Sequence, residues 1–172
     1  MPLKYKVLAR QMTNLDSCVS FMKHGRRMES LPFAEVCESV KQTFGREMNV
    51  NIFRQILTIV PEFYTHAWIN GALTLEATQD LRSPQTVEQR LSRMNQRLME
   101  RTKAQFVEFC ARQHIDDPQS YIDNRVWHHA FDPNAEASEV ELTNLNPQPV
   151  TSRPETFRSF LNRSAVVADK TL

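Results

Sequence analysis

Residues 55–77 read QILTIVPEFYTHAWINGALTLEA and contain the change of periodicity on which the predicted architecture depends. Up to Val60 the apolar side chains follow the spacing of a helix, and Pro61 ends that helix because proline lacks the backbone N–H that its continuation needs. The apolar period then becomes two, which is typical of a strand. Asn70-Gly71 follows, a pair that favours a two-residue hairpin turn because both central positions need positive φ. The sequence therefore predicts a helix followed by a β-hairpin.

The turn also fixes the register of the predicted hairpin. It pairs three side chains of the first strand with three of the second: Tyr64 with Ala77, His66 with Leu75, and Trp68 with Leu73. In this register one face of the hairpin is almost wholly apolar, which favours the pairing.

Two more helices are predicted before this region. Between residues 5 and 22 the apolar side chains recur at alternating steps of four and three, and the pattern stops at Gly25. Pro32 suits the first turn of the next helix. The residues expected to face inward are Leu8, Met12, Leu15, Val19 and Met22 in the first helix, Phe33, Val36, Val40 and Phe44 in the second, and Phe53, Ile56, Leu57 and Val60 in the third. Three helices followed by a two-stranded wing predict a winged-helix arrangement.

The chain after the hairpin is predicted to be mainly helical, so the expected fold class is mostly α with a small β-hairpin. Ser83 and Pro84 suit the cap and the first turn of a long helix over 84–113. A short helix is expected from Asp117-Pro118 through Asn124.

Three segments are expected along the chain. They are a winged-helix domain over 1–131 that includes the long helix, an acidic and proline-rich extended linker over 132–153, and a terminal helix over 154–172. Residues 125–150 are interpreted as an extended tail rather than a second core. The sequence reads as a domain excised from a longer protein, with the terminal helix leading toward a further domain.

Composition excludes several classes of protein. With 172 residues, 41% hydrophobic content and 24% charged content, the chain is able to form a sizeable core. Its formal net charge of +1 gives no overall attraction to nucleic acid or membranes. It also lacks the run of about 18 apolar residues that a membrane span needs. Cys18, Cys37 and Cys110 are interpreted as buried free thiols, which indicates the cytosol or the nucleus.

The sequence offers little for catalysis. Its three glycines are too far apart to build a phosphate-binding loop, and no nucleophile elbow or zincin motif occurs. Asp116-Asp117 is interpreted as a helix-capping pair rather than an acid–base pair. We therefore expect no catalytic residues and no cofactor.

A zinc site is the metal site that the sequence could support. Cys110 and His114 lie four residues apart and share a helix face, and His128-His129 follow later. A buried thiol, a surface His114 and histidines stacked near Trp127 explain the same residues without a metal. No metal site is therefore predicted.

Sequence-specific DNA reading through the wing is disfavoured. The outward face of the third helix offers Asn51, Arg54 and Thr58, but no Lys or Arg occurs between Arg54 and Arg82. Because phosphate contacts dominate protein–DNA affinity, a wing without cations makes a poor DNA-binding element.

An arginine ridge is predicted on the long helix. Arg90, Arg93, Arg97 and Arg101 fall within an arc of roughly 80° at 100° per residue, and an apolar seam adjoins them. Such a ridge suits a helical partner with acidic flanks, or phosphate. The alternative interpretation is a solvated face beside a core-packing seam.

The corner between the third helix and the hairpin is a second candidate surface. Pro61, Phe63, Tyr64 and Trp68 place large rings where a helix ends and a strand begins. Exposed aromatic residues are typical of interfaces. The alternative is that Tyr64 and Trp68 pack the hairpin onto the helices.

Several stretches, taken in order, carry a family resemblance. They are Tyr5-Lys6-Val7-Leu8-Ala9 with Leu15-Asp16, Phe33-Ala34-Glu35-Val36, Gln55-Ile56-Leu57-Thr58-Ile59-Val60-Pro61 with Tyr64, and Trp127-His128 with Phe131, followed by acids and Pro147. Together they resemble the central, geminin-binding domain of the chromatin licensing and DNA replication factor (Cdt) family over roughly residues 3–150.

The resemblance implies a nuclear, non-enzymatic protein of replication licensing. Its partners would be geminin, a dimeric coiled coil that inhibits licensing, the MCM helicase and the origin recognition complex, with at most weak binding to DNA and none to membranes. The family's geminin-binding face maps onto Pro61 and Tyr64. With the ridge and the corner included, the expected partner-binding residues are Pro61, Phe63, Tyr64, Trp68, Arg90, Arg93, Arg97 and Arg101. The alternative function is a winged-helix nucleic-acid-binding regulator that uses the ridge.

Overall fold

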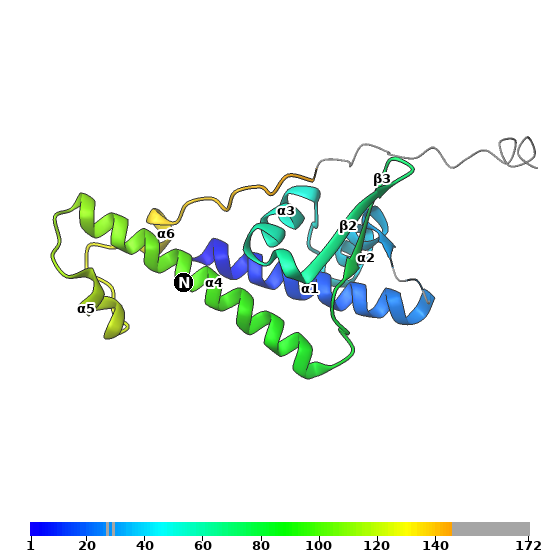
Figure 1. Cartoon of the computed structure of the whole chain (residues 1–172), viewed down its shortest axis with the longest axis horizontal. Coiled ribbons are helices and arrows are strands. Elements are labelled where there is room, and N and C mark those ends of the chain that lie inside the picture. The colour runs from blue at the N-terminus through cyan, green and yellow to red at the C-terminus, as the bar shows by residue number, and fades with distance from the viewer. Residues whose placement is uncertain (27, 29, 146–172) are drawn as a thin grey trace, which may run out of the picture.

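The computed structural model describes residues 1–26, 28 and 30–145. Its elements are α1 (Leu3–Arg26), β1 (Leu31–Pro32), α2 (Phe33–Phe44), α3 (Val50–Ile59), the 3₁₀ turn η1 (Pro61–Phe63), β2 (Tyr64–Ile69), β3 (Ala72–Ala77), α4 (Pro84–Arg112), α5 (Pro118–Asp123) and α6 (Pro133–Glu136). Figure 1 shows an elongated molecule in which α1 and α4 are the long helices. The fold is mostly helical with a small antiparallel sheet, as the sequence predicts. The helix expected over 154–172 and the last part of the expected linker, 146–153, lie outside the described residues.

None of the helices in the described part of the chain has both the length and the apolar content needed to cross a lipid bilayer.

The first three helices build the main core. The apolar stripe of α1 is buried as predicted, and Met12 and Leu15 have no exposed surface. α3 begins at Asn49, whose side chain caps the helix by accepting a hydrogen bond from a backbone N–H. α2 ends at Gly45, which takes the left-handed conformation with φ of 61°. Phe44, expected to face inward, is 39% exposed because it is the last residue of α2, next to this cap.

The hairpin has the predicted register. β2 and β3 pair antiparallel, with Tyr64 opposite Ala77, His66 opposite Leu75 and Trp68 opposite Leu73. A short third strand, β1, pairs with the other edge of β3 and gives the order β1-β3-β2. The sequence did not predict β1, because two residues are too few to display a strand period. The three helices with this hairpin are compatible with the predicted winged helix.

α4 begins and ends where the sequence predicts, to within one residue. The Ser83 side chain accepts a hydrogen bond from the Thr86 N–H at 3.4 Å, and Pro84 occupies the first helical position. α4 packs against α1 and buries Met94 and Leu98 in the main core. Its C-terminal half continues past this core.

A second apolar cluster, here called the terminal lobe, surrounds the end of α4. Its members are Phe106, Phe109, Cys110 and Phe131, with Ile115, Tyr121, Ile122 and Trp127 packed against them. The interpretation of residues 125–150 as a tail without a core is therefore wrong for Trp127 and Phe131, whose ring centroids each lie 5.0 Å from that of Phe106. Because α4 projects beyond the main core, its last apolar side chains need a separate cover, which the chain after α5 provides.

Residues 137–145 form an extended segment, here called the strap. Figure 1 shows it running from α6 past the start of α1 and along α3. Ala137, Val140 and Leu145 are at most 7% exposed and belong to the main core. The strap is thus part of the folded body.

The strap also covers part of the outward face of α3. The Arg54 Nε–H donates to the Thr143 carbonyl oxygen at 2.7 Å, and the Thr58 hydroxyl donates to the Glu141 carbonyl oxygen at 2.6 Å. The expectation that Arg54 and Thr58 face solvent is corrected accordingly. Polar side chains on this face satisfy the backbone groups of an extended segment that lacks a strand partner.

Candidate partner-interaction surface

The corner between α3 and the hairpin separates exposed from buried side chains. Pro61 follows Val60, the residue that caps the end of α3, and is exposed, as is Glu62. The 3₁₀ turn that Pro61 begins then carries Phe63 and Tyr64 into the interior, where they are 4% and 2% exposed. The expectation that Phe63 and Tyr64 offer rings to a partner is therefore wrong for the folded chain. They pack the hairpin onto the helices.

Arg90 lies beneath this corner in a buried ion pair with Asp16 of α1. Its Nε and Nη2 donate to the two carboxylate oxygens of Asp16 at 2.9 and 2.8 Å, and both side chains are 1% exposed. The expectation that Arg90 belongs to an exposed ridge is wrong. It shares an α4 stripe with Met94 and Leu98, and that stripe faces the core.

Two aromatic rings complete the surroundings of Arg90. Its guanidinium carbon lies 4.1 Å from the ring centroid of Phe63 and 4.9 Å from that of Tyr64. The Tyr64 hydroxyl donates to Asp16 Oδ1. Arg90 Nη1 also donates to the Phe63 carbonyl oxygen at 3.2 Å. The network joins α1, η1, β2 and α4, and its role is to hold the corner in place.

The protonation states within this network are mutually supporting. Burial, reinforced by the negative charge of Asp16, raises the pKa of Tyr64 well above its ordinary value, so the phenol stays neutral and donates. Burial alone would lower the pKa of Arg90, but its hydrogen bonds and charge interaction with Asp16 raise that pKa. The network therefore holds a neutral phenol and a charged guanidinium at neutral pH.

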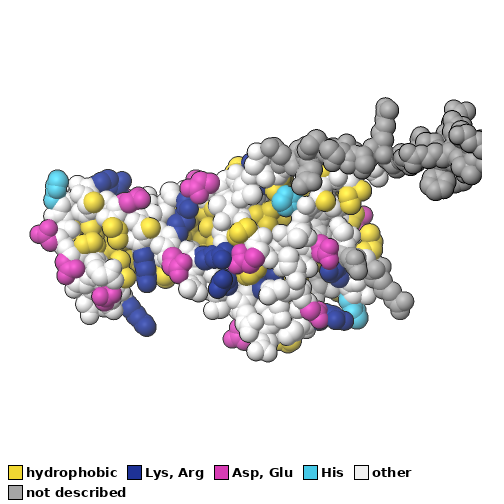
Figure 2. Space-filling model, in the orientation of Figure 1, with side chains coloured by type: hydrophobic (Ala, Val, Ile, Leu, Met, Phe, Trp, Pro, Cys, Tyr) yellow, Lys and Arg dark blue, Asp and Glu magenta, His cyan; other side chains and the backbone are white. Residues whose placement is uncertain are grey.

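Glu62 brings the corner and the exposed arginines together. Arg97 Nη2 lies 2.8 Å from Glu62 Oε1, and Arg93 Nε lies 3.6 Å from the same oxygen. Arg97 Nη1 also donates to the Ile59 carbonyl oxygen at 2.7 Å. We call Pro61, Glu62, Arg93 and Arg97 the corner patch. In Figure 2, Lys/Arg and Asp/Glu side chains lie side by side across the middle of the molecule.

The corner patch keeps a net positive charge. Partial burial acts to raise the pKa of Glu62, but hydrogen bonds from its backbone and from Arg97, with the charges of Arg97 and Arg93, lower it below its ordinary value. Glu62 is therefore ionised at neutral pH, and two guanidinium groups share one carboxylate. The Arg93 side chain is 56% exposed and the less tightly held of the two.

The remaining predicted residues, Arg101 and Trp68, contact the strap. Arg101 Nη2 lies 3.1 Å from Glu141 Oε1 and donates to the Glu139 carbonyl oxygen at 3.0 Å. The Trp68 indole N–H donates to the Leu145 carbonyl oxygen at 2.8 Å, and the residue remains 37% exposed. Both are thus tied to this chain's own backbone.

The predicted set divides into three groups. Pro61, Arg93 and the half-buried Arg97 belong, with Glu62, to the corner patch, whereas Arg101 and Trp68 hold the strap. Phe63, Tyr64 and Arg90 form the buried network. Sequence reasoning did not identify Asp16 or Glu62 as the carboxylates that organise these groups. The sequence did contain a signal for Asp16, because this acidic residue lies directly beside the apolar stripe of α1.

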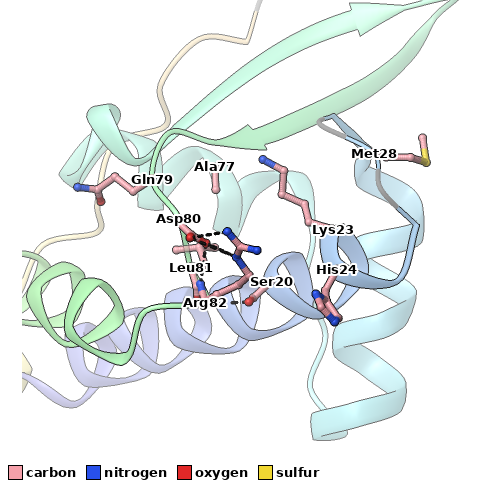
Figure 3. A pocket seen from close by; sticks show the side chains of 9 residues that line it. All are labelled: Ser20, Lys23, His24, Met28, Ala77, Gln79, Asp80, Leu81 and Arg82. Atoms are coloured by element: carbon pink, nitrogen blue, oxygen red, sulfur yellow. Dashed lines mark hydrogen bonds and ion pairs between the residues drawn. The ribbon is translucent and has the colours of Figure 1, made fainter.

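A separate hollow lies between the end of α1 and the connection from β3 to α4. Figure 3 shows Asp80 and Arg82 paired with each other at this site, and the Ser20 hydroxyl donates to the Leu81 carbonyl oxygen at 3.2 Å. Hydrogen bonds from Arg82 lower the pKa of Asp80 to about 2. The Asp80 carboxylate is therefore held in an ion pair with Arg82.

The histidine and cysteine residues weighed for zinc do not converge within the described ranges, where no group of three or more potential ligands is placed to hold a metal ion. Cys110 is buried in the terminal lobe, and the rings of His128 and His129 stack with centroids 4.1 Å apart.

Comparison with known families gives a match to the first part of the chain. The family model described as "DNA replication factor CDT1 like" matches residues 1–74. This range contains Pro61, Glu62 and Trp68 but not the arginines of α4. No curated protein matches the chain.

Proposed function

We propose, from the match of residues 1–74 to the CDT1-like family of DNA replication factors, that the chain is a protein-interaction module of replication licensing that geminin binds and inhibits. The module helps to load the MCM helicase at origins, together with the origin recognition complex, and it acts in the nucleus. It has no catalytic role in this proposal.

The corner patch is the observation that carries the proposal. It combines an exposed proline with two guanidinium groups that share a single carboxylate, so it has positive charge to offer an acidic partner. A coiled coil with acidic flanks fits this chemistry, since its carboxylates would compete with Glu62 for Arg93 and Arg97. Arginine is also enriched at the centres of interfaces.

The proposed inhibition is mutual exclusion. If geminin and the helicase use overlapping surfaces, binding of one lowers the apparent affinity of the other by the same factor in each direction. The buried network beneath the patch fixes the corner before any partner arrives, which reduces the ordering cost of binding.

Charge reversal of the patch tests the proposal. Arg93→Glu with Arg97→Glu should weaken binding of a geminin coiled coil by about tenfold or more, because two favourable pairs become repulsive. Titration calorimetry on the full chain measures the affinity, and circular dichroism verifies that the fold is retained.

Arg112→Glu is the matched control. Arg112 lies on the same helix and its side chain is 62% exposed, similar to that of Arg93, but it pairs with Glu136 beside the terminal lobe. Its reversal should leave the geminin affinity unchanged. Equal losses in both variants would indicate a general charge effect and would remove the corner patch from the proposal.

The nucleic-acid alternative has less support from the geometry. Arg54 and Thr58 of α3 contact the strap, and two of the four ridge arginines are not free either, because Arg90 is buried and Arg101 is paired with Glu141 of the strap. This alternative requires a steep fall of affinity with salt, with a slope near −0.9 per phosphate contact. We expect no such slope for duplex DNA.

A further inference from the structure

A groove opens between α4 and the chain that follows α5, in the terminal lobe. It has a volume of about 300 Å³, and apolar side chains form its walls: Met99 from α4, with Ile122, Val126 and Trp127 from α5 and the loop beyond. We call it the terminal groove. Val126 is 51% exposed, and the other three are half-buried. The volume is at the lower end of the range for ligand pockets and is enough for one or two large side chains.

Two cations stand at this groove without a carboxylate partner. Lys103 and Arg125 line it, and neither forms an ion pair within the part of the chain that the structure describes. The five arginines of α4 differ in this respect, because each is paired with a carboxylate: Arg90 with Asp16, Arg93 and Arg97 with Glu62, Arg101 with Glu141, and Arg112 with Glu136. Lys103 and Arg125 therefore differ from these five arginines, because they place unpaired positive charge beside an apolar groove.

Asp123 also lines the groove, but the net charge of the side chains that line the groove remains positive. The Asp123 Oδ1 oxygen accepts a hydrogen bond from Gln119 Nε2 at 2.6 Å, one turn earlier on α5. With Lys103 and Arg125 both cationic, the three charged side chains sum to one positive charge.

The backbone of Arg125 adopts a conformation that is unusual for a residue with a side chain. Arg125 has φ of 57°, in the left-handed region that glycine adopts without strain. Its N–H donates to the Ile122 carbonyl oxygen and the Val126 N–H donates to that of Tyr121, which together end α5 in a Schellman motif. The chain thus places a cationic residue at a position where glycine is usual.

We propose that the terminal groove is a second docking site, which takes an acidic segment of a partner protein that inserts a large apolar side chain. The apolar walls receive the side chain, and Lys103 and Arg125 pair with flanking carboxylates. This site is distinct from the corner patch, since Met99 and Lys103 lie about 120° around α4 from Arg93 and Arg97 at 100° per residue. It does not depend on the proposed function.

The test uses fluorescence anisotropy with the full chain and a labelled peptide of the type Glu-Glu-Leu-Phe-Glu-Glu. Arg125→Gly should weaken binding by about threefold, as for the loss of one exposed ion pair. Lys103→Glu with Arg125→Glu should weaken it by about tenfold or more. Binding should also fall as salt rises, because exposed charges are screened.

Variants and probes separate the proposal from its competitors. His114→Gly, which changes a left-handed residue with φ of 52° at the end of α4, should leave binding unchanged. A peptide with serine in place of leucine and phenylalanine should bind at least about tenfold more weakly. Because Arg125→Gly removes backbone strain, it serves as the test even if the double variant fails to fold.

Four results would overturn the proposal: no binding of the acidic apolar peptide, unchanged affinity in Arg125→Gly, equal affinity for the serine peptide, or equally tight binding of a single-stranded oligonucleotide. The last result would assign the two cations to nucleic acid.

Discussion

At the scale of single residues, the pairing of Asp16 with Arg90 determines how the corner is built. Both side chains are almost fully buried, and Tyr64 and Phe63 enclose them. A buried ion pair gives little net stability over an apolar pair of equal volume, but removal of one partner leaves the other charge uncompensated. The network therefore makes the corner sensitive to substitution.

Asp16→Ala should lower the free energy of unfolding by about 3–5 kcal/mol, because Arg90 would remain buried without its carboxylate. Urea denaturation followed by circular dichroism measures the change.

The neighbouring Ser17→Ala variant is the control for the Asp16 prediction. Ser17 is exposed, and its hydroxyl donates to the Thr13 carbonyl oxygen of the same helix. Its loss should change stability by no more than about 0.5 kcal/mol. A loss below about 1 kcal/mol in Asp16→Ala would mean that the pair is not buried in solution as it is in this structure.

At the scale of elements, several turns and helix ends of this chain use left-handed residues other than glycine. The sequence has three glycines, and several turns are instead closed by other residues in the left-handed region: Asn70, His114, Asp117 and Arg125. At the end of α4, His114 N–H donates to the Ala111 carbonyl oxygen and Ile115 N–H to that of Cys110. This is again a Schellman motif, with histidine at the position that favours glycine.

His114→Gly should stabilise the chain by about 0.5–1 kcal/mol. The left-handed conformation costs a non-glycine residue about 1–2 kcal/mol, and the greater freedom of glycine in the unfolded chain offsets part of that gain. Thermal unfolding monitored by circular dichroism would reveal the increase.

Gly45→Ala is the reciprocal variant, since Gly45 ends α2 with φ of 61°. It should destabilise the chain, because alanine is strained in that conformation. The same sign of change in both variants would contradict the argument from backbone strain.

At the scale of the whole molecule, two apolar clusters share α4. The main core lies between the first three helices, the sheet and the first half of α4, and the terminal lobe surrounds the other end. The strap returns from the lobe to the main core and contacts α1, α3 and α4. The corner patch thus belongs to one cluster and the terminal groove to the other.

Phe131→Ala should loosen the terminal lobe without unfolding the main core. Phe131 packs on both Phe106 and Phe109 but belongs to the smaller cluster, and truncation of a buried phenylalanine costs about 3–5 kcal/mol. Hydrogen exchange should accelerate at the amides of α5 and the last turns of α4, while those of α1 and α3 keep their protection. Uniform acceleration across all helices would show that the two clusters unfold together.

The amino-acid sequence alone was sufficient for the elements and their local order. Helical spacing, Pro61, Asn70-Gly71 and the Ser83 cap predicted α1 to α4 and the hairpin register, because these signals depend on contacts within a few residues. The order of short stretches also indicated a family resemblance, and the CDT1-like family model matches residues 1–74. The partner-binding roles of Pro61, Arg93, Arg97, Arg101 and Trp68 remain predictions.

The division of the predicted site residues between surface and interior was decided by tertiary packing. Arg90 and Arg93 have the same side chain and lie three residues apart, yet one is buried against Asp16 and the other is exposed beside Glu62. Helical periodicity gives only the angle of a side chain around its axis. The carboxylate that it meets comes from a segment distant in sequence, 74 residues away in the case of Arg90 and Asp16. The strap and the terminal lobe depend on equally distant contacts, so only the folded chain could reveal them.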